Sequence, residues 1–182
     1  RMAYTEWGDA PNPRVLVCVH GLTRCGRDFD FLAEALANEF RVICPDVVGR
    51  GQSDWLRNKS LYGVVQYLAD MVTLIARLDV EHVNWLGTSM GGLIGMALAA
   101  QENTPVSRLI LNDVGPVVTA QSIQRIGEYI GHDPRFDNIE QAELFVRTVS
   151  YTFGQLTDAQ WRHLTQHIVR TAADGKIEFR YD

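Results

Sequence analysis

The residues with the clearest chemical potential are Gly87-Thr88-Ser89-Met90-Gly91, a G-x-S-x-G segment between an apolar run and a run of small residues. A serine hydroxyl becomes an effective nucleophile when it projects from the backbone toward a base, and a sharp turn between a strand and a helix projects it in that way. Glycine on each side leaves room for the neighbouring strand and helix. The pattern predicts that Ser89 is a nucleophile and that Gly87 and Gly91 shape its turn, rather than a chance glycine-serine turn.

A second group of residues could stabilise the negative charge that forms when a serine attacks a carbonyl. His20-Gly21-Leu22 directly follows a strongly apolar run. We expect the backbone N–H groups of Leu22 and Met90 to bind the charged oxygen, as an oxyanion hole does. His20 and Gly21 are expected to shape this loop. A role for His20 as the catalytic base is the less favoured alternative.

The elements that would position these residues alternate between strands and helices. Short apolar runs predict buried strands at 15–19, 41–44, 83–86 and 108–111. Helices are predicted at 29–40, in a segment that Ser60 would cap, and at 91–100. The predicted buried faces are Phe29, Leu32, Ala33 and Leu36 on the first helix, and Val65, Leu68, Ala69, Val72, Ile75 and Ala76 on the second. This rhythm predicts an α/β fold with a mostly parallel sheet.

The pattern changes after Pro116, where apolar residues recur at helical spacing without an intervening strand. One helix face is predicted from Ile139 to Phe153 and another from Trp161 to Ala172. We therefore expect residues 1–116 to form the core, and 117–182 to form a helical segment followed by the start of a return to the sheet.

Composition and charge narrow the class of protein. Seventeen basic and 22 acidic residues give a net charge of -5 in 182 residues, and no basic run suggests a nucleic-acid partner. The sequence shows neither a membrane-spanning apolar stretch nor a secretory signal. Cys18, Cys25 and Cys44 are too few for a disulfide framework, and Cys18 and Cys44 are expected in the core. A cytoplasmic location is therefore expected.

Two further groups of polar residues have simple explanations. His163 and His167 lie four residues apart and could bind a metal ion, but no third ligand is evident and their neighbours are polar. We expect neither a metal ion nor a cofactor. Asp46 is expected to hydrogen-bond the glycine-rich turn that it begins.

Taken together, the segments 15–21, 46–53, 87–91 and 108–116 resemble successive strands and loops of the α/β-hydrolase fold family. The H-G-x loop, the D-x-x-G-x-G-x-S turn and the G-x-S-x-G segment occur in the order and at the spacing of that family. The segment after Pro116 resembles the family's helical cap. The resemblance implies a serine hydrolase that forms an acyl-enzyme on Ser89.

The resemblance also implies a catalytic triad in the chain order Ser, Asp or Glu, then His. None of His82, His132, His163 and His167 follows a strand in the expected way. We therefore expect the catalytic histidine, the usual acid and the C-terminal strands to lie outside residues 1–182. Asp113 is the alternative acid; otherwise its carboxylate is expected to tie down the loop that enters the cap.

The expected substrate is a small carboxylic ester or a lactone. A serine nucleophile excludes the epoxide hydrolases and dehalogenases of the family, which use a carboxylate. Carbon–carbon bond hydrolases and cofactor-free haloperoxidases of the same fold remain alternatives, as does a non-catalytic homologue that binds a small molecule. A Gly-His pair near the C-terminus of the full-length protein would favour an enzyme over a binding protein.

Overall fold

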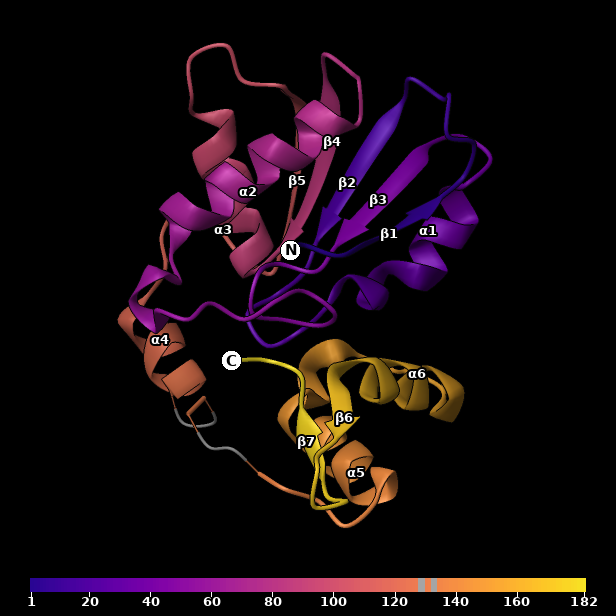
Figure 1. Ribbon diagram of the computed structural model, residues 1–182, viewed down its shortest axis with the longest axis vertical. Helices are drawn as coiled ribbons and strands as arrows, with labels where there is room; N and C mark the ends of the chain where they lie inside the picture. The colour runs from indigo at the N-terminus through magenta and orange to yellow at the C-terminus, as the bar shows by residue number, and fades with distance from the viewer. Residues whose placement is uncertain (128–129, 132–133) are drawn as a thin grey trace. The chain divides into compact units, whose positions relative to one another are not determined.

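The structure is a computed structural model that describes residues 1–127, 130–131 and 134–182. The chain forms two compact units, Arg1–Val117 together with Asp182, and Val118–Tyr181 (Figure 1). His132 lies outside the described residues. None of the helices in the described part of the chain is both long enough and apolar enough to cross a membrane.

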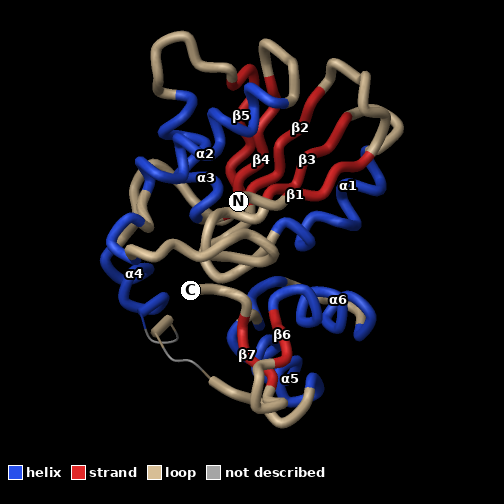
Figure 2. The backbone as a smooth tube through the Cα atoms, viewed as in Figure 1, coloured by secondary structure: helices blue, strands red, loops and turns tan. Residues whose placement is uncertain are grey.

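The first unit is built on a five-stranded sheet (Figure 2). Its strands are β1 (Tyr4–Trp7), β2 (Val15–Val19), β3 (Arg41–Pro45), β4 (Val83–Thr88) and β5 (Val106–Asn112), in the order β1-β3-β2-β4-β5. The last four strands are mutually parallel where they pair, and β1 runs antiparallel to β3. The predicted α/β fold with a mostly parallel sheet is confirmed. Because parallel strands end at the same edge, the loops that follow β2, β3 and β4 gather there.

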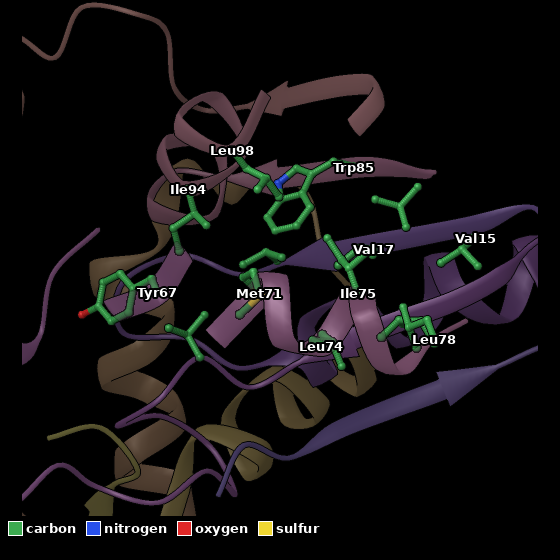
Figure 3. Packing of buried hydrophobic residues seen from close by; sticks show 14 of the residues in the cluster. Val15, Val17, Tyr67, Met71, Leu74, Ile75, Leu78, Trp85, Ile94 and Leu98 are labelled. Atoms are coloured by element: carbon green, nitrogen blue, oxygen red, sulfur yellow. The ribbon is translucent and has the colours of Figure 1, made fainter. Parts of the chain in front are cut away.

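Helices cover both faces of this sheet. They are α1 (Asp30–Leu36), which follows a 3-10 helix at Gly26–Phe29, α2 (Val64–Arg77) and α3 (Met90–Ala99). Alternate side chains of β2 point to opposite faces. Val15, Val17 and Val19 pack with α2 and α3, as Figure 3 shows for Val15 and Val17, whereas Leu16 and Cys18 pack with α1. Cys44 joins the second cluster, so the predicted core positions of Cys18 and Cys44 are confirmed.

The predicted buried face of α2 is wrong in most of its members. Val65 is 84% exposed and Val72 is 45% exposed, whereas Tyr67, Met71 and Leu74 are buried against the sheet (Figure 3). The helix carries two apolar stripes, and helical periodicity does not distinguish between them. The stripe that contains the larger side chains, Tyr67 and Met71, packs on the sheet.

Two details at the ends of helices also differ from expectation. Ser60 does not cap α2: it lies in a 3-10 helix at Lys59–Leu61, where Asn58 accepts a hydrogen bond from the Ser60 backbone N–H. The N-cap of α2 is Gly63. On the predicted face of the first helical segment, Phe29 and Ala33 are buried and Leu36 packs against the same cluster, whereas Leu32 is 37% exposed.

The second unit contains α4 (Ala120–Gly127), α5 (Ile139–Val149), a 3-10 helix at Tyr151–Phe153, and α6 (Asp158–Ile168). The two helices predicted here are present, although both end earlier than expected. A hairpin of β6 (Val169–Thr171) and β7 (Ile177–Phe179) follows α6. Residues 177–179 thus pair with β6 and not with the main sheet, while Asp182, the last residue of the segment in which a return to the core was expected, is grouped with the first unit. The chain reverses at Asp174-Gly175, where Gly175 has a φ of 85° and donates a hydrogen bond to the Ala172 oxygen.

Candidate active site

Ser89 is the single residue between β4 and α3, and its backbone is strained. Its φ of 50° and ψ of -113° lie in a region that side chains disfavour. The Ser89 N–H donates to the Asn112 oxygen at 2.9 Å, and the Ser89 oxygen accepts from the Gly92 N–H at 2.9 Å. Hydrogen bonds to β5 and to the first turn of α3 therefore hold the serine in this conformation, between the end of a strand and the start of a helix.

Glycines allow α3 to approach the sheet at backbone distance. A Cβ atom on Gly87 would lie 2.3 Å from the Gly91 oxygen, and one on Gly91 would lie 2.0 Å from the Val19 oxygen. Further along the helix, a Cβ on Gly95 would lie 2.4 Å from Nε1 of Trp85, a buried indole that donates to the Gly91 oxygen at 3.0 Å. The elbow thus requires glycine for space at both positions flanking the serine.

The loop after β2 passes beside the serine. A Cβ atom on Gly21 would lie 3.8 Å from the Ser89 Cβ. Within the part of the chain that the structure describes, the backbone N–H groups of Leu22 and Met90 donate no hydrogen bond. The Met90 N–H is at the first position of α3, the positive end of the helix dipole. The two donors remain available for an oxygen that gains negative charge.

His20 is fully buried in the same loop, and both of its ring nitrogens are engaged. Nε2 accepts a hydrogen bond from the Val47 N–H at 2.9 Å, so the ring proton lies on Nδ1, which donates to the Gly21 oxygen at 2.7 Å. Burial, the largest effect, lowers the pKa of His20 below its ordinary value. The geometry fits a loop-shaping role and leaves no nitrogen to accept the proton of Ser89.

The buried neutral state of His20 predicts a specific dependence of stability on pH. Because the pKa is lower in the folded than in the unfolded protein, the unfolded state binds the proton more readily. The folding free energy that depends on neutral His20 is present above about pH 6.5 and is lost as the pH falls toward the folded pKa, with a slope of at most about 1.4 kcal/mol per pH unit. We expect the Tm of His20→Gln to fall less than that of the wild type between pH 7.5 and 5. Equal pH slopes for the two proteins would contradict this expectation.

The glycine-rich turn after β3 is anchored by Asp46. Its Oδ2 accepts from the Gln52 N–H at 2.8 Å, and its Oδ1 accepts from the Gly26 N–H at 2.7 Å. A Cβ on Gly51 would lie 2.3 Å from Asp46 Oδ2. The predicted structural role of Asp46 is confirmed, and the carboxylate also ties this turn to the chain ahead of α1.

The sequence profile of the alpha/beta hydrolase fold matches residues 14–157. The chain belongs to the α/β hydrolase fold family. It is 56% identical over 170 residues to a 3-hydroxybutyrate-oligomer hydrolase of Cupriavidus necator, covering 93% of this chain and 58% of the relative. Among solved structures, a proposed hydrolase from Rickettsia typhi has 34% identity and a TM-score of 0.96, and an alpha/beta hydrolase from Novosphingobium aromaticivorans has 36% identity and a TM-score of 0.88. Both matches cover 100% of this chain and 64% of the other, so the chain spans less than two thirds of these relatives.

The remaining candidates for an acid, a base or a metal ligand lie on different elements: Asp113 after β5, His82 before β4, and His163 and His167 on α6. Asp113 is exposed just after β5, with a φ of 54°, and its carboxylate makes no hydrogen bond to another described residue. The expected tie between this carboxylate and its loop is therefore wrong. His82 precedes β4 whereas Ser89 follows it, so the length of the strand, about 20 Å, separates them. His163 and His167 lie one turn apart on α6, with ring centroids 4.6 Å apart.

Proposed function

We propose that the protein is a serine hydrolase that cleaves carboxylic esters through an acyl-enzyme on Ser89. The observation that carries the proposal is the strained backbone of Ser89 at the junction of β4 and α3, beside the unused N–H groups of Leu22 and Met90. Storing strain at a single serine is typical of a nucleophile elbow. The fold of a hydrolase family supports the same reading.

The proposed chemistry proceeds by two acyl transfers. The Ser89 oxygen forms a bond to the ester carbonyl carbon while its proton passes to a general base, and the carbonyl electron pair moves to the oxygen held by the Leu22 and Met90 N–H groups. The bond to the alcohol oxygen then breaks, and the alcohol leaves with the proton. Water repeats the sequence on the acyl-enzyme and restores the serine.

In this proposal the general base and its usual acid partner belong to the part of the enzyme's length that the chain does not span. Two observations on the chain's own histidines favour this assignment. His20 uses both nitrogens in its loop, and His82 lies at the opposite end of β4 from the serine. Asp113, exposed after β5, is kept as the alternative acid.

For the substrate class, we propose short linear esters of hydroxy acids. The relative with 56% identity is named a 3-hydroxybutyrate-oligomer hydrolase. Oligomers of a hydroxy acid are joined by ester bonds, and each cleavage releases an alcohol and a carboxylate, as the two-step mechanism requires. A lactone is the cyclic form of the same linkage.

The test is labelling of the full-length protein with a fluorophosphonate, which bonds to activated serines. Peptide mapping by mass spectrometry should place one phosphonyl group per molecule on Ser89. Hydrolysis of a 3-hydroxybutyrate trimer should disappear in proportion to labelling, and heat-denatured protein should not be labelled. Stoichiometric labelling of another serine, or full turnover by the labelled protein, would contradict the proposal; the absence of any labelling would favour a protein that only binds its ligand.

A further inference from the structure

The N–H of Leu22 belongs to a peptide unit that is held from its oxygen side. The Gly21 oxygen accepts hydrogen bonds from His20 Nδ1 at 2.7 Å and from the Arg24 N–H at 3.2 Å. Because a peptide unit is planar and trans, its oxygen and its N–H point in opposite directions. Two donors on the oxygen thus direct the Leu22 N–H away from the interior of its own loop.

The next peptide unit is held by a residue from a different loop. Arg50, on the turn after β3, donates from Nε to the Leu22 oxygen at 3.0 Å. Its Nη1 donates to the Val48 oxygen at 2.8 Å and to the Tyr67 hydroxyl at 2.9 Å. With the Gly21 oxygen also held, both peptide units that flank the Leu22 Cα are fixed by hydrogen bonds.

Arg50 is itself tightly constrained. Its side chain is buried, and its guanidinium carbon lies 5.4 Å from the ring centroids of both Tyr62 and Tyr67. The Tyr62 hydroxyl donates to Asp182 at 2.7 Å and accepts from the Leu56 N–H at 2.8 Å, which fixes that ring. A planar guanidinium that contacts two rings and donates to fixed acceptors retains a defined direction for its N–H groups.

Arg50 also carries a positive charge next to the loop that follows β2. Within the described residues Arg50 makes no salt bridge, so no carboxylate in direct contact cancels its charge. Burial is the main cause of the lowered pKa of His20, and the positive charge of Arg50 acts in the same direction. The guanidinium therefore places a positive charge in direct contact with the loop that contains Leu22.

We propose that Arg50 is a positioning residue for the oxyanion hole. It holds the Leu22 carbonyl so that the neighbouring N–H of Leu22 is aimed at the oxygen forming on the substrate of Ser89. This inference rests on the proposed function, because it assigns that N–H a role in catalysis. Arg50 was not predicted from the sequence. The signal present in the sequence was Gly49-Arg50-Gly51, a long cationic side chain between two glycines. In the structure the φ values of these glycines are 83° and 55°.

The experiment compares Arg50→Met and Arg50→Lys in the full-length protein, with kcat expressed per serine titrated by fluorophosphonate. Removing a direct oxyanion donor costs about 10²–10³-fold in kcat. In Arg50→Met the donor remains but is misdirected, so we expect kcat to fall by about 10-fold or more and KM to stay within about twofold of the wild-type value. Arg50→Lys keeps the charge but lacks the fork of donors, so it should fall between the wild type and Arg50→Met.

Inhibition by a trifluoromethyl ketone analogue of the ester reports on oxyanion binding directly. Its inhibition constant should not change if Arg50 only supports the fold. This ketone forms a tetrahedral oxyanion on the serine, so its inhibition constant should rise by the same factor by which kcat/KM falls. Tyr67→Phe removes one partner of Arg50 and should show a smaller change in the same direction. Arg41→Met is the matched control, since Arg41 also donates to a backbone oxygen, that of Leu78 at 3.0 Å, in another part of the sheet.

The outcomes separate this inference from the proposed function. If the titrated Arg50 variants keep the kcat and the inhibition constant of Arg41→Met, Arg50 is only structural and the inference is wrong. If Ser89→Ala retains turnover, the proposed function itself fails. Where Arg50→Met yields no folded protein, Arg50→Lys and Tyr67→Phe decide, because each keeps most of the packing around the guanidinium.

Discussion

Ser89→Ala is expected to lower kcat for ester hydrolysis by about six orders of magnitude, with little change in KM. The side chain forms a covalent bond only along the reaction coordinate, so its removal affects the transition state far more than substrate binding. The backbone strain remains, because alanine at a φ of 50° is as unfavourable as serine. Steady-state kinetics on a 3-hydroxybutyrate trimer with full-length protein would measure the loss. The variant should still hydrolyse the ester about 10³-fold faster than the uncatalysed reaction in water, because the oxyanion hole remains.

Two variants make this result specific. Ser107→Ala removes an exposed serine on β5 and should behave as the wild type. Ser89→Gly removes the same hydroxyl but tolerates positive φ, so it should be as inactive as Ser89→Ala and unfold at a higher temperature. Wild-type turnover by Ser89→Ala would mean that a different nucleophile acts, and equal melting temperatures of the two Ser89 variants would argue against strain at the elbow.

Gly91→Ala is expected to destabilise the fold by at least about 3 kcal/mol. The added Cβ would lie 2.0 Å from the Val19 oxygen and 2.5 Å from its carbonyl carbon. Both are backbone atoms of β2, so relief requires α3 to move off the sheet. We expect the midpoint of urea unfolding to fall and labelling of Ser89 by fluorophosphonate to be lost.

Gly115→Ala is the matched control for this substitution, because, its chain neighbours aside, no described residue has an atom within 4 Å of the position that its Cβ would occupy. Its urea midpoint should be close to that of the wild type. A Gly91→Ala protein with wild-type stability and normal labelling would show that α3 can move away from β2 without cost, which would contradict the close packing described here.

Much of the first unit could be predicted because its signals are local. The run Val15–Val19 is apolar at every position, and all five residues are buried in β2. Other features depend on contacts that periodicity cannot reveal. The burial of Tyr67 rather than Val65 on α2 is decided by how the helix rotates onto the sheet. The strand β1 was missed because it is short and half exposed at an edge. The β6–β7 hairpin had one local signal, the pair Asp174-Gly175.

The candidate site shows the same division. The segment from Gly87 to Gly91 could be recognised because the turn's geometry imposes its own residue types. The contact between Arg50 and Leu22 could not, since it joins two loops 28 residues apart that meet only because β2 and β3 are neighbours and parallel. Interactions that depend on the assembled sheet edge leave little trace in residue spacing.

The glycines beneath α3 also limit where this fold can accept new side chains when it is engineered in the laboratory. At Gly87 and Gly91 backbone packs directly on backbone, with no side chains between them, so no pocket wall there can be enlarged or reshaped. A directed-evolution library that varies these positions would yield mostly unfolded chains. Diversity is better placed at Leu22 and Thr23, whose side chains are partly exposed while hydrogen bonds hold the backbone on both sides of the Leu22 Cα.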